Sequence, residues 1–582
     1  MQKRYEMFKM FKRLKPYALS VAGVLFFVFF QSLCELYIPS LMADIVDSGI
    51  LKGDINYVVK TGAYMLLFTL GIIIFSLMSN FLSAMVSARF SEKLRSDIFE
   101  RVENFSLDEF NRFGTSSLIT RTTNDVTQVQ TVILIIMRMM VMAPIMAVGG
   151  IFMAIKTDAG LSWILLAALP AIVLMIAFVL KKGGKLFSSM QSKLDRLNLV
   201  MRENITGMRV IRAFDRVDHE KKRFKNANDD LVETGIKANK IMAVLMPGIQ
   251  IILNLTTVLI VWFGSKRISM QQMEVGSLMA YIQYASLILF SFVMMSMLFV
   301  MIPRAMSSAG RINEVLETES SIKEASVLKY TQNQKRGEIE FKNVSFAYMG
   351  ADEPVLSDIS FKTEKGEVTA IIGGTGSGKS TLINLIPRFY DVTKGEVLVD
   401  GVNIADMPVH FLRNKIGLVP QKSVLFSGTI MDNIRYGKDD ATDEEIKNAL
   451  DIADATEFIN DMKDGYDTII SQGGKNVSGG QKQRISIARA LVRKPEIYIF
   501  DDSFSALDAK TDAKVRSRMM SELKDSTVII VAQKISSIIN ADRIIVLDEG
   551  KISGIGKHDE LIKSNDVYRD MASSQLKEEE LL

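Results

Sequence analysis

The sequence predicts two domains: an α-helical membrane domain with six long transmembrane helices, followed by an α/β domain. Three observations support this fold class. Six apolar stretches near or above the roughly 20 residues needed to cross a bilayer recur in the first half of the chain and then stop. From about residue 338, short β-branched runs alternate with amphipathic stretches, which is typical of an α/β domain. One of these runs leads directly into a glycine-rich loop.

Composition narrows the function classes. The 582 residues are 48% apolar and 23% charged, which is too apolar for a disordered chain. The 70 Lys and Arg residues nearly cancel the 66 Asp and Glu residues, so the net charge of +4 does not suggest a nucleic-acid binder. The single cysteine, Cys34, excludes an intramolecular disulfide and a zinc site built on cysteines. The three histidines, His219, His410 and His558, are too scattered to indicate a metal cluster.

The apolar stretches predict a multi-pass protein of the plasma membrane. They cover residues 19–38, 58–78, 132–155, 161–180, 241–262 and 278–302. The segment before the first stretch contains several Lys and Arg residues but only one acidic residue, Glu6. By the positive-inside tendency, this places the N-terminus in the cytoplasm. Six crossings return the second half of the chain to the same side. The α/β domain is therefore predicted to be cytoplasmic.

The segments between the stretches alternate in length. Short links follow the first, third and fifth stretches, whereas long charged segments, residues 87–130 and 181–240, follow the second and fourth. We expect the long segments to be helices that continue into the cytoplasm; the alternative is a pair of folded soluble loops. The predicted domains are a transmembrane domain over residues 1–320, a linker over 321–337 and an α/β domain over 338–582.

Polar residues and methionines stand out in the apolar stretches. Arg138, Asn254, Gln31 and Glu35 lie in otherwise apolar runs. Because burying a charge there is costly, we expect Arg138 to face the bundle interior or a water-filled cavity, either on a substrate path or in an interhelical bond. Many of the 34 methionines also lie here, which suits a promiscuous apolar pocket but equally ordinary packing against lipid.

The glycine-rich loop has the pattern GxxxxGK[ST] in its required context, after a strand predicted at 368–372 and before a helix. Its residues are Gly373, Gly374, Thr375, Gly376, Ser377, Gly378, Lys379, Ser380 and Thr381. Glycines let successive backbone N–H groups close on phosphates. Lys379 places a positive charge on the β and γ phosphates, and the Ser380 hydroxyl is suited to ligate Mg²⁺. The pattern predicts ATP binding.

A second predicted strand at 497–500 ends in Asp501, the position of an acid that holds Mg²⁺ through water. Between the two motifs lie Ser478, Gly479, Gly480 and Gln481, and with this signature the sequence resembles an ABC transporter. Other landmarks of that family match in order. Tyr348 corresponds to the aromatic that stacks on adenine, Gln421 to the Q-loop glutamine, and residues 505–508 to the D-loop.

The resemblance implies a fold, cofactors and a partner. Six spans and one nucleotide-binding domain in one chain resemble the half-transporters of bacterial multidrug and lipid exporters, which have the type IV ABC exporter fold. ATP and Mg²⁺ are implied, with Ser380, Gln421 and Asp501 as metal ligands. Two nucleotide domains would sandwich ATP, with Ser478 of one chain acting in trans on the nucleotide of the other. Residues 106–117 and 207–218 would contain coupling helices that transmit motion between the domains.

Three positions depart from the family pattern. Asp502 stands where the family has a glutamate that polarises the attacking water, and its carboxylate is one methylene, about 1.5 Å, short. A misplacement of about 1 Å costs on the order of 10²-fold in rate. Gln533 replaces the switch histidine, and an amide cannot take a proton as imidazole does. Gln472 stands before the signature in place of a common glutamate.

These features predict one subunit of an ATP-driven exporter that moves amphipathic drugs or lipids outward. Its own site would bind ATP and hydrolyse it slowly, while its intact signature completes a competent site on a different half-transporter that retains the Glu and His. Open alternatives are a homodimeric lipid or peptide exporter, and an ATP-gated channel or sensor on the same scaffold. A soluble ABC ATPase acting on DNA or ribosomes, and an importer subunit, are disfavoured because six spans share the chain with the nucleotide domain.

Overall fold

The structure is a computed structural model that describes residues 2–324 and 336–575. The chain forms two compact units. The first unit comprises Met1–Val102 and Ser116–Glu317, and the second comprises Glu103–Thr115 and Thr318–Leu582. Most of the linker predicted at 321–337 lies outside the described residues.

The first unit is built from long apolar helices. Its six candidate membrane spans coincide with the six predicted stretches. The principal helices are α2 (Ala18–Asp44), α3 (Ile55–Glu103), α6 (Val126–Thr157), α7 (Ser162–Thr206), α10 (Leu245–Ser269) and α11 (Val275–Glu317). The fifth candidate span, Val217–Ser269, contains the predicted stretch 241–262. It is interrupted at Val244, before α10, because Pro247 has no N–H and crowds the carbonyl of Ala243, where the preceding helix ends.

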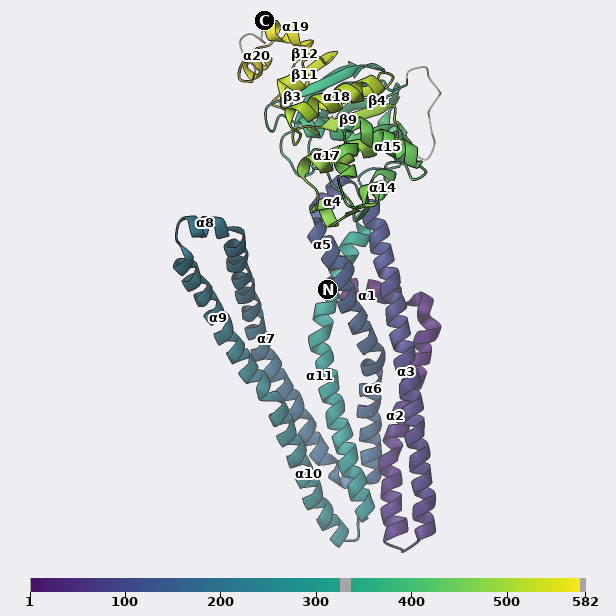
Figure 1. Ribbon diagram of the computed structural model, residues 1–582. Coiled ribbons are helices and arrows are strands. Elements are labelled where there is room, and N and C mark those ends of the chain that lie inside the picture. Colours follow the sequence, from purple (N-terminus) through teal and green to yellow (C-terminus); the bar gives the residue numbers. More distant parts are fainter. Residues whose placement is uncertain (1, 325–335, 576–582) are drawn as a thin grey trace. The chain divides into compact units, whose positions relative to one another are not determined.

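The two helices that lead into the predicted long segments, α3 and α7, are far longer than a bilayer requires. α3 has 49 residues and α7 has 45, so each runs on without a break beyond its apolar stretch. Short helices follow them: α4 (Leu107–Phe113) and α5 (Thr115–Thr120) after α3, and α8 (Met208–Ala213) after α7. Figure 1 shows α8 at the turn between α7 and α9 (Val217–Ala243). The long segments are thus helical, as the sequence predicted.

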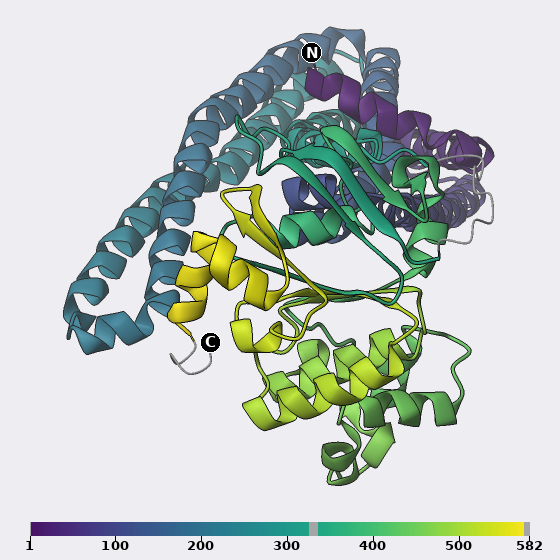
Figure 2. The same ribbon diagram turned by 90° about the horizontal axis from the view of Figure 1, so that it is seen from above.

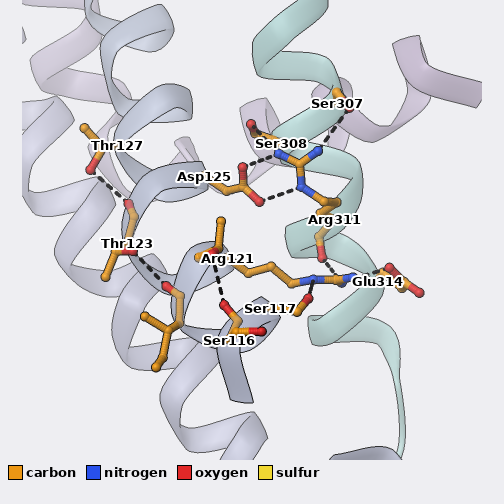
Figure 3. Close-up of polar contacts among 12 residues, drawn as sticks. Ser116, Ser117, Arg121, Thr123, Asp125, Thr127, Ser307, Ser308, Arg311 and Glu314 are labelled. Atoms are coloured by element: carbon orange, nitrogen blue, oxygen red, sulfur yellow. Dashed lines mark hydrogen bonds and ion pairs between the residues drawn. The ribbon is translucent and has the colours of Figure 1, made fainter. Parts of the chain in front are cut away.

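A charged cluster joins α11 to the π-helical turn η3 (Arg121–Asp125) just before α6 (Figure 3). Arg311 of α11 donates from Nε to Asp125 Oδ2 at 2.7 Å, and its Nη2 bonds the other carboxylate oxygen. Arg121 donates in the opposite direction, to the carbonyl of Arg311 at 2.7 Å and to Glu314 at 2.8 Å. Asp125 is only 3% exposed. Two crossed arginines therefore fasten these helices together.

The N-terminal segment forms a helix that the sequence prediction missed, α1 (Gln2–Lys12). Met10 is fully buried, and Asn313 of α11 donates to the backbone carbonyl of Glu6 at 3.0 Å. The sequence did not predict this helix because its many Lys and Arg residues, from which the orientation of the chain was inferred, leave only a weak apolar pattern.

Among the polar residues of the apolar stretches, Gln31 is buried and Arg138 is half-buried. The Oε2 atom of Glu35 is enclosed and has no hydrogen-bond partner among the described residues.

The described residues of the second unit form three sheets. A six-stranded sheet has the order β12-β11-β3-β10-β9-β6, a four-stranded sheet has the order β2-β1-β4-β5, and β7 pairs with β8. The strands are β1 (Ile339–Phe346), β2 (Leu356–Thr363), β3 (Val368–Gly373), β4 (Lys394–Val399), β5 (Val402–Asn403), β6 (Ile416–Val419), β7 (Gly428–Thr429), β8 (Ile469–Ile470), β9 (Ile497–Asp501), β10 (Thr527–Val531), β11 (Arg543–Asp548) and β12 (Lys551–Gly556).

Helices and the four-stranded sheet flank the six-stranded sheet, as Figure 2 shows for the second unit. The helices of the second unit from residue 336 on are α12 (Lys379–Leu385), α13 (Val409–Asn414), α14 (Ile430–Arg435), α15 (Asp443–Ile452), α16 (Thr456–Asn460), α17 (Gly479–Leu491), α18 (Ala509–Glu522), α19 (His558–Ser564) and α20 (Asp566–Ser573). Among them, α12, α13 and α17 contact strands of the six-stranded sheet. The central strands are buried, since β9 and β10 have no exposed residue, which matches their continuous β-branched and aromatic runs.

Candidate functional site

The candidate site lies at the carboxyl ends of four neighbouring parallel strands. β3, β10, β9 and β6 are adjacent in that order and parallel throughout. The glycine-rich loop follows β3 and Gln533 follows β10. Asp501 is the last residue of β9, Asp502 comes directly after it, and Gln421 follows β6. Because the carboxyl ends of parallel strands meet at one edge of a sheet, residues far apart in sequence converge here.

The glycine-rich loop turns back on itself at two glycines. Gly376 and Gly378 have φ of +85° and +96°, a region that favours glycine, and Gly378 is the N-cap of α12. Gly373 allows close packing, since a Cβ there would lie 2.2 Å from the carbonyl oxygen of Leu547. Lys379 Nζ donates to the carbonyls of Gly373 and Gly374 at 2.9 and 2.7 Å, which holds its ammonium over the loop. The loop is shaped to close around an anion.

Ser380 and Asp501 bring two oxygen atoms together beside this loop. Ser380 Oγ donates to Asp501 Oδ1 at 3.3 Å. Burial raises the pKa of Asp501, and the Ser380 hydrogen bond and the charge of Lys379 oppose that shift. Burial lowers the pKa of Lys379, while the neighbouring Asp501 and Asp502 carboxylates act in the opposite direction. A hydroxyl and a carboxylate are the kind of ligands that Mg²⁺ prefers, so the donor set fits this ion.

Asp502 is contacted by both of the glutamines that the sequence placed in the pocket. Its Oδ2 atom accepts from Gln533 Nε2 at 3.0 Å and from Gln421 Nε2 at 3.3 Å. The backbone of Asp502 has φ of +45°, which an aspartate tolerates better than a bulkier residue. Gln533 at the predicted switch position and Gln421 at the predicted Q-loop position therefore both donate to the same carboxylate oxygen of Asp502.

A residue that the sequence prediction missed holds the segment carrying Gln533. The Gln575 carboxamide donates to the carbonyl of Gln533 at 3.1 Å and accepts from the N–H of Ile535 at 2.9 Å. From α18, Arg516 donates to the carbonyl of Ser537 at 2.7 Å. A cavity of 410 Å³ lies beside this segment and reaches Asp502. Nothing in the sequence spacing signals the Gln575 contact, because it joins residues about 40 positions apart.

Tyr348 lies next to the helix that follows the loop. Its hydroxyl is 2.9 Å from Thr381 Oγ1, and its ring meets Phe346 and Tyr390 edge to face. It is thus placed beside the phosphate loop, within a small aromatic cluster. Thr375 and Ser377 complete the loop, and the Ser377 hydroxyl is enclosed without a hydrogen-bond partner among the described residues.

The Ser-Gly-Gly-Gln segment forms the start of α17. Ser478 is the N-cap, and its Oγ accepts from the N–H of Gln481 while Gln481 Oε1 accepts from the N–H of Ser478 at 2.8 Å. Gly479 and Gly480 occupy the first helical turn, where their N–H groups lack intrahelical acceptors. The N–H of Ala506 donates to Gln483 at 3.2 Å, so the predicted D-loop packs on this helix. A helix N-terminus of this kind suits a phosphate.

Comparisons with known proteins agree with the two-unit architecture. A family model described as the ABC transporter transmembrane region matches residues 21–292, and a model described as ABC transporter matches residues 356–505. An uncharacterized ABC transporter ATP-binding protein of Mycobacterium tuberculosis is 42% identical over 567 residues, which is 97% of each chain. The chain belongs to the ABC transporter family. A Bacillus subtilis protein of the same description is 41% identical over 97% of each chain.

A solved structure extends this assignment to the fold. A bacterial Atm1-family ABC exporter with ATP bound has a TM-score of 0.79 and 25% sequence identity, and the match covers 96% of this chain and 99% of that one. The predicted fold class, a six-helix membrane domain of the type IV exporter fold plus an α/β nucleotide-binding domain, is confirmed. This ABC half-transporter is an ATPase coupled to transport, and its ABC domain binds ATP.

The two predicted coupling segments have different surroundings. α4 belongs to the nucleotide-binding unit, where Leu107 packs against the core and Asn111 donates to the Tyr390 hydroxyl at 3.4 Å. The buried Phe113 ring stacks on Phe105 at 5.7 Å, and Phe110 is half-buried.

By contrast, α8 and the residues next to it have exposed apolar side chains. Met208, Val210 and Phe214 are 40%, 60% and 74% exposed, and Arg212 lies on the same short helix.

Proposed function

We propose that this chain is one half of a heterodimeric exporter, that its own nucleotide site binds ATP but hydrolyses it slowly, and that its signature completes the competent site of a different subunit. The observation that carries the proposal is the shared contact of Gln533 and Gln421 with Asp502 Oδ2. The acid that should accept a proton from water is both short and held by two amide donors.

Nucleotide binding rests on the glycine-rich loop. In this proposal its backbone N–H groups bind the phosphates, the Lys379 ammonium leaves the carbonyls of Gly373 and Gly374 for phosphate oxygens, and the Tyr348 ring stacks on adenine. Ser380, Asp501 and Gln421 would hold Mg²⁺, which neutralises phosphate charge when bound. Ser380 and Asp501 are already within hydrogen-bonding distance of each other, which favours this assignment.

Hydrolysis at this site would be slow for two separate reasons. The Asp502 carboxylate reaches about 1.5 Å less far than that of a glutamate on the same backbone. A general base must lie within hydrogen-bonding reach of the proton that it takes. Gln533 donates a hydrogen bond through its amide but has no basic nitrogen, so it cannot replace a histidine. ATP would therefore stay bound and hold the two nucleotide domains together.

The remaining assignments follow from the same architecture. Ser478 and the N–H groups of Gly479 and Gly480 would bind the γ-phosphate of a nucleotide on the partner. The exposed apolar residues Met208, Val210 and Phe214 suit contact with that partner. We place the nucleotide domain in the cytoplasm of a cell whose plasma membrane the six helices cross, and we propose amphipathic drugs or lipids as cargo, because the membrane helices are rich in methionine.

A gain-of-function pair tests the impaired site. The purified chain alone, in lipid nanodiscs, should hydrolyse ATP far below ordinary transporter rates. Asp502→Glu should raise the rate by about 10²-fold, because it restores the missing reach and a misplacement of about 1 Å costs on that order, and Gln533→His should raise it further. Because the signature is intact, a self-associated variant has all the groups that hydrolysis needs.

The control is Lys379→Ala in the Asp502→Glu background, which should abolish the gained activity by weakening ATP binding. Ordinary hydrolysis rates from the wild-type chain alone would contradict the proposal, as would a double variant that is no faster than wild type.

A further inference from the structure

Glu109 is a buried acid within the nucleotide-binding unit that serves none of the roles described above. It lies on α4 and is 4% exposed. Its Oε2 atom accepts from the N–H of Ser106 at 2.8 Å and from the Ser106 hydroxyl at 2.6 Å. These contacts form the capping box that begins α4. A capping box needs only one of the two carboxylate oxygens.

The second oxygen reaches a different part of the chain, the connecting segment (residues 318–324) that leads from α11 into the nucleotide domain. Glu109 Oε1 accepts from the backbone N–H of Ser321 at 3.2 Å, and the hydroxyls of Ser106 and Ser321 are 2.9 Å apart. The Ser106 hydroxyl has one proton and gives it to Glu109, so Ser321 is the donor in the hydroxyl pair. Ser321 lies four residues beyond Glu317, where α11 ends. One carboxylate thus joins α4 to the connecting segment.

The connecting segment has a second attachment two residues later. Arg388, which is 3% exposed, donates from Nη2 to the carbonyl of Lys323 at 3.2 Å and pairs with Asp391. Arg388 lies three residues after α12, the helix that begins at Lys379 of the phosphate loop. A short series of polar contacts therefore leads from the end of α12 through the connecting segment to Glu109 and α4.

We propose that Glu109 is a positioning residue that fastens the connecting segment to the coupling helix, so that the nucleotide domain pulls on α3 and α11 together. The chain passes into this unit directly from α3 at Glu103 and again from α11 at Glu317. With both of these connections tied to one carboxylate, a movement of the nucleotide domain reaches both helices at once. Without the tie, α4 stays capped, but the α11 connection moves independently.

Glu109→Gln separates the two jobs of this side chain. One amide oxygen can still accept from the N–H and hydroxyl of Ser106, so the cap of α4 is kept. The amide nitrogen then faces the N–H of Ser321, donor against donor, and the hydrogen bond from residue 109 to the connecting segment is lost. Ser321→Pro removes the same bond from the other side because proline has no N–H. Ser321→Ala is the matched control, since it keeps the backbone N–H.

The measurement compares ATP hydrolysis with motion of the membrane helices in the complete assembly in nanodiscs. Hydrogen–deuterium exchange is followed with and without ATP and vanadate. In wild type and Ser321→Ala, trapping should change exchange in both the nucleotide domain and the membrane helices. In Glu109→Gln and Ser321→Pro, faster exchange of the peptide over 318–324 should accompany a response of α11 that is reduced about fivefold or more, with hydrolysis largely kept.

Two outcomes would overturn the proposal. If Glu109→Gln leaves the exchange of 318–324 and the response of α11 unchanged, the tie is absent or does not transmit motion. If Glu109→Gln lowers hydrolysis, stability and the α11 response in parallel, Glu109 has only a structural role. The slow-site proposal is independent of both outcomes, because it is tested on Asp502 and Gln533.

Discussion

One methylene group and one imidazole distinguish the pocket of this chain from the pattern that its family resemblance implies. Each substitution alone could be tolerated, since an aspartate is still an acid and a glutamine still donates to phosphate. Their contact makes the combination more informative, because Gln533 and Gln421 both donate to Asp502 Oδ2. A carboxylate that already accepts two hydrogen bonds has a weaker hold on the proton of an attacking water.

A residue-scale prediction concerns His558, which lies outside the nucleotide site. Its Nδ1 atom is 2.7 Å from the buried Tyr568 hydroxyl, and burial lowers its pKa below the ordinary value of 6.5. The neutral form is therefore favoured in the folded state, so the contribution to stability is present above pH 6.5 and is lost as pH falls through the folded-state pKa. The wild-type chain should lose thermal stability between about pH 7.5 and 5.5.

His558→Gln should reduce that loss, since an amide can still accept from Tyr568 but does not titrate in this range. Thermal unfolding of the full-length chain in detergent at the two pH values is the measurement. His219→Gln serves as the control and should keep the wild-type slope, because His219 is exposed. Equal slopes for all three proteins would exclude His558 as the titrating group.

Sequence reasoning identified candidate residues that belong to local motifs and missed contacts between segments that are far apart on the chain. The phosphate loop is recognisable because its spacing on the chain is itself a requirement of the chemistry, whereas Asp501 follows from its place at the end of an apolar strand and Ser478 from the resemblance of its segment to the ABC signature. The Gln575 and Glu109 contacts join segments about 40 and 212 positions apart, so only tertiary structure reveals them. The shared contact on Asp502 is intermediate: both glutamines were predicted to lie in the pocket, but not to meet on one oxygen.

At the level of whole elements, the membrane helices are predicted well and their internal breaks are not. Apolar length predicts where each span lies, and it succeeds because the bilayer sets a minimum length. The break at Val244 and the π-helical turn η3 depend on local backbone geometry instead. η3 matters because it carries Asp125 and Arg121 to the crossed contacts with α11 (Figure 3).

A further prediction concerns these contacts between η3 and α11. Asp125→Ala removes a buried carboxylate and leaves the Arg311 guanidinium without that partner. Breaking a fully buried pair costs about 3–5 kcal/mol, and because the Arg311 side chain is 45% exposed we expect a smaller loss, about 1–2 kcal/mol. Thermal unfolding of the chain in detergent measures it.

The double variant Asp125→Ala/Arg311→Ala should be less destabilised than the sum of the two single variants, since both remove one interaction. Thr131→Ala, which loses only an intrahelical bond to Thr127, is the control and should change stability little. Strict additivity of the two single variants would show that the pair contributes no coupling energy.

For the whole molecule, the central question is whether the two ATP sites of the assembly are equal. In the proposed dimer, each site would use the phosphate loop of one chain and the signature of the other. In this chain Asp502 and Gln533, the proposed positions of the catalytic acid and the switch, depart from the pattern that the family resemblance implies, whereas Ser478 and its capping contacts are regular. We therefore expect substitutions in the phosphate loop and in the signature of this domain to have different effects on ATP hydrolysis.

The last prediction uses this asymmetry. In the complex with its natural partner, Ser478→Ala in this chain should lower ATP hydrolysis by about 10²-fold, because it removes a donor from the competent site on the partner. Lys379→Ala in this chain should have a much smaller effect, because it acts on the slow site. In a homodimer every site contains both residues, so the two variants would be equally damaging. Steady-state ATPase rates of the two variant complexes, purified at matched subunit ratios, test the proposal: equal losses would show that the two sites contribute equally and contradict it, and a large excess loss for Ser478→Ala would support unequal sites.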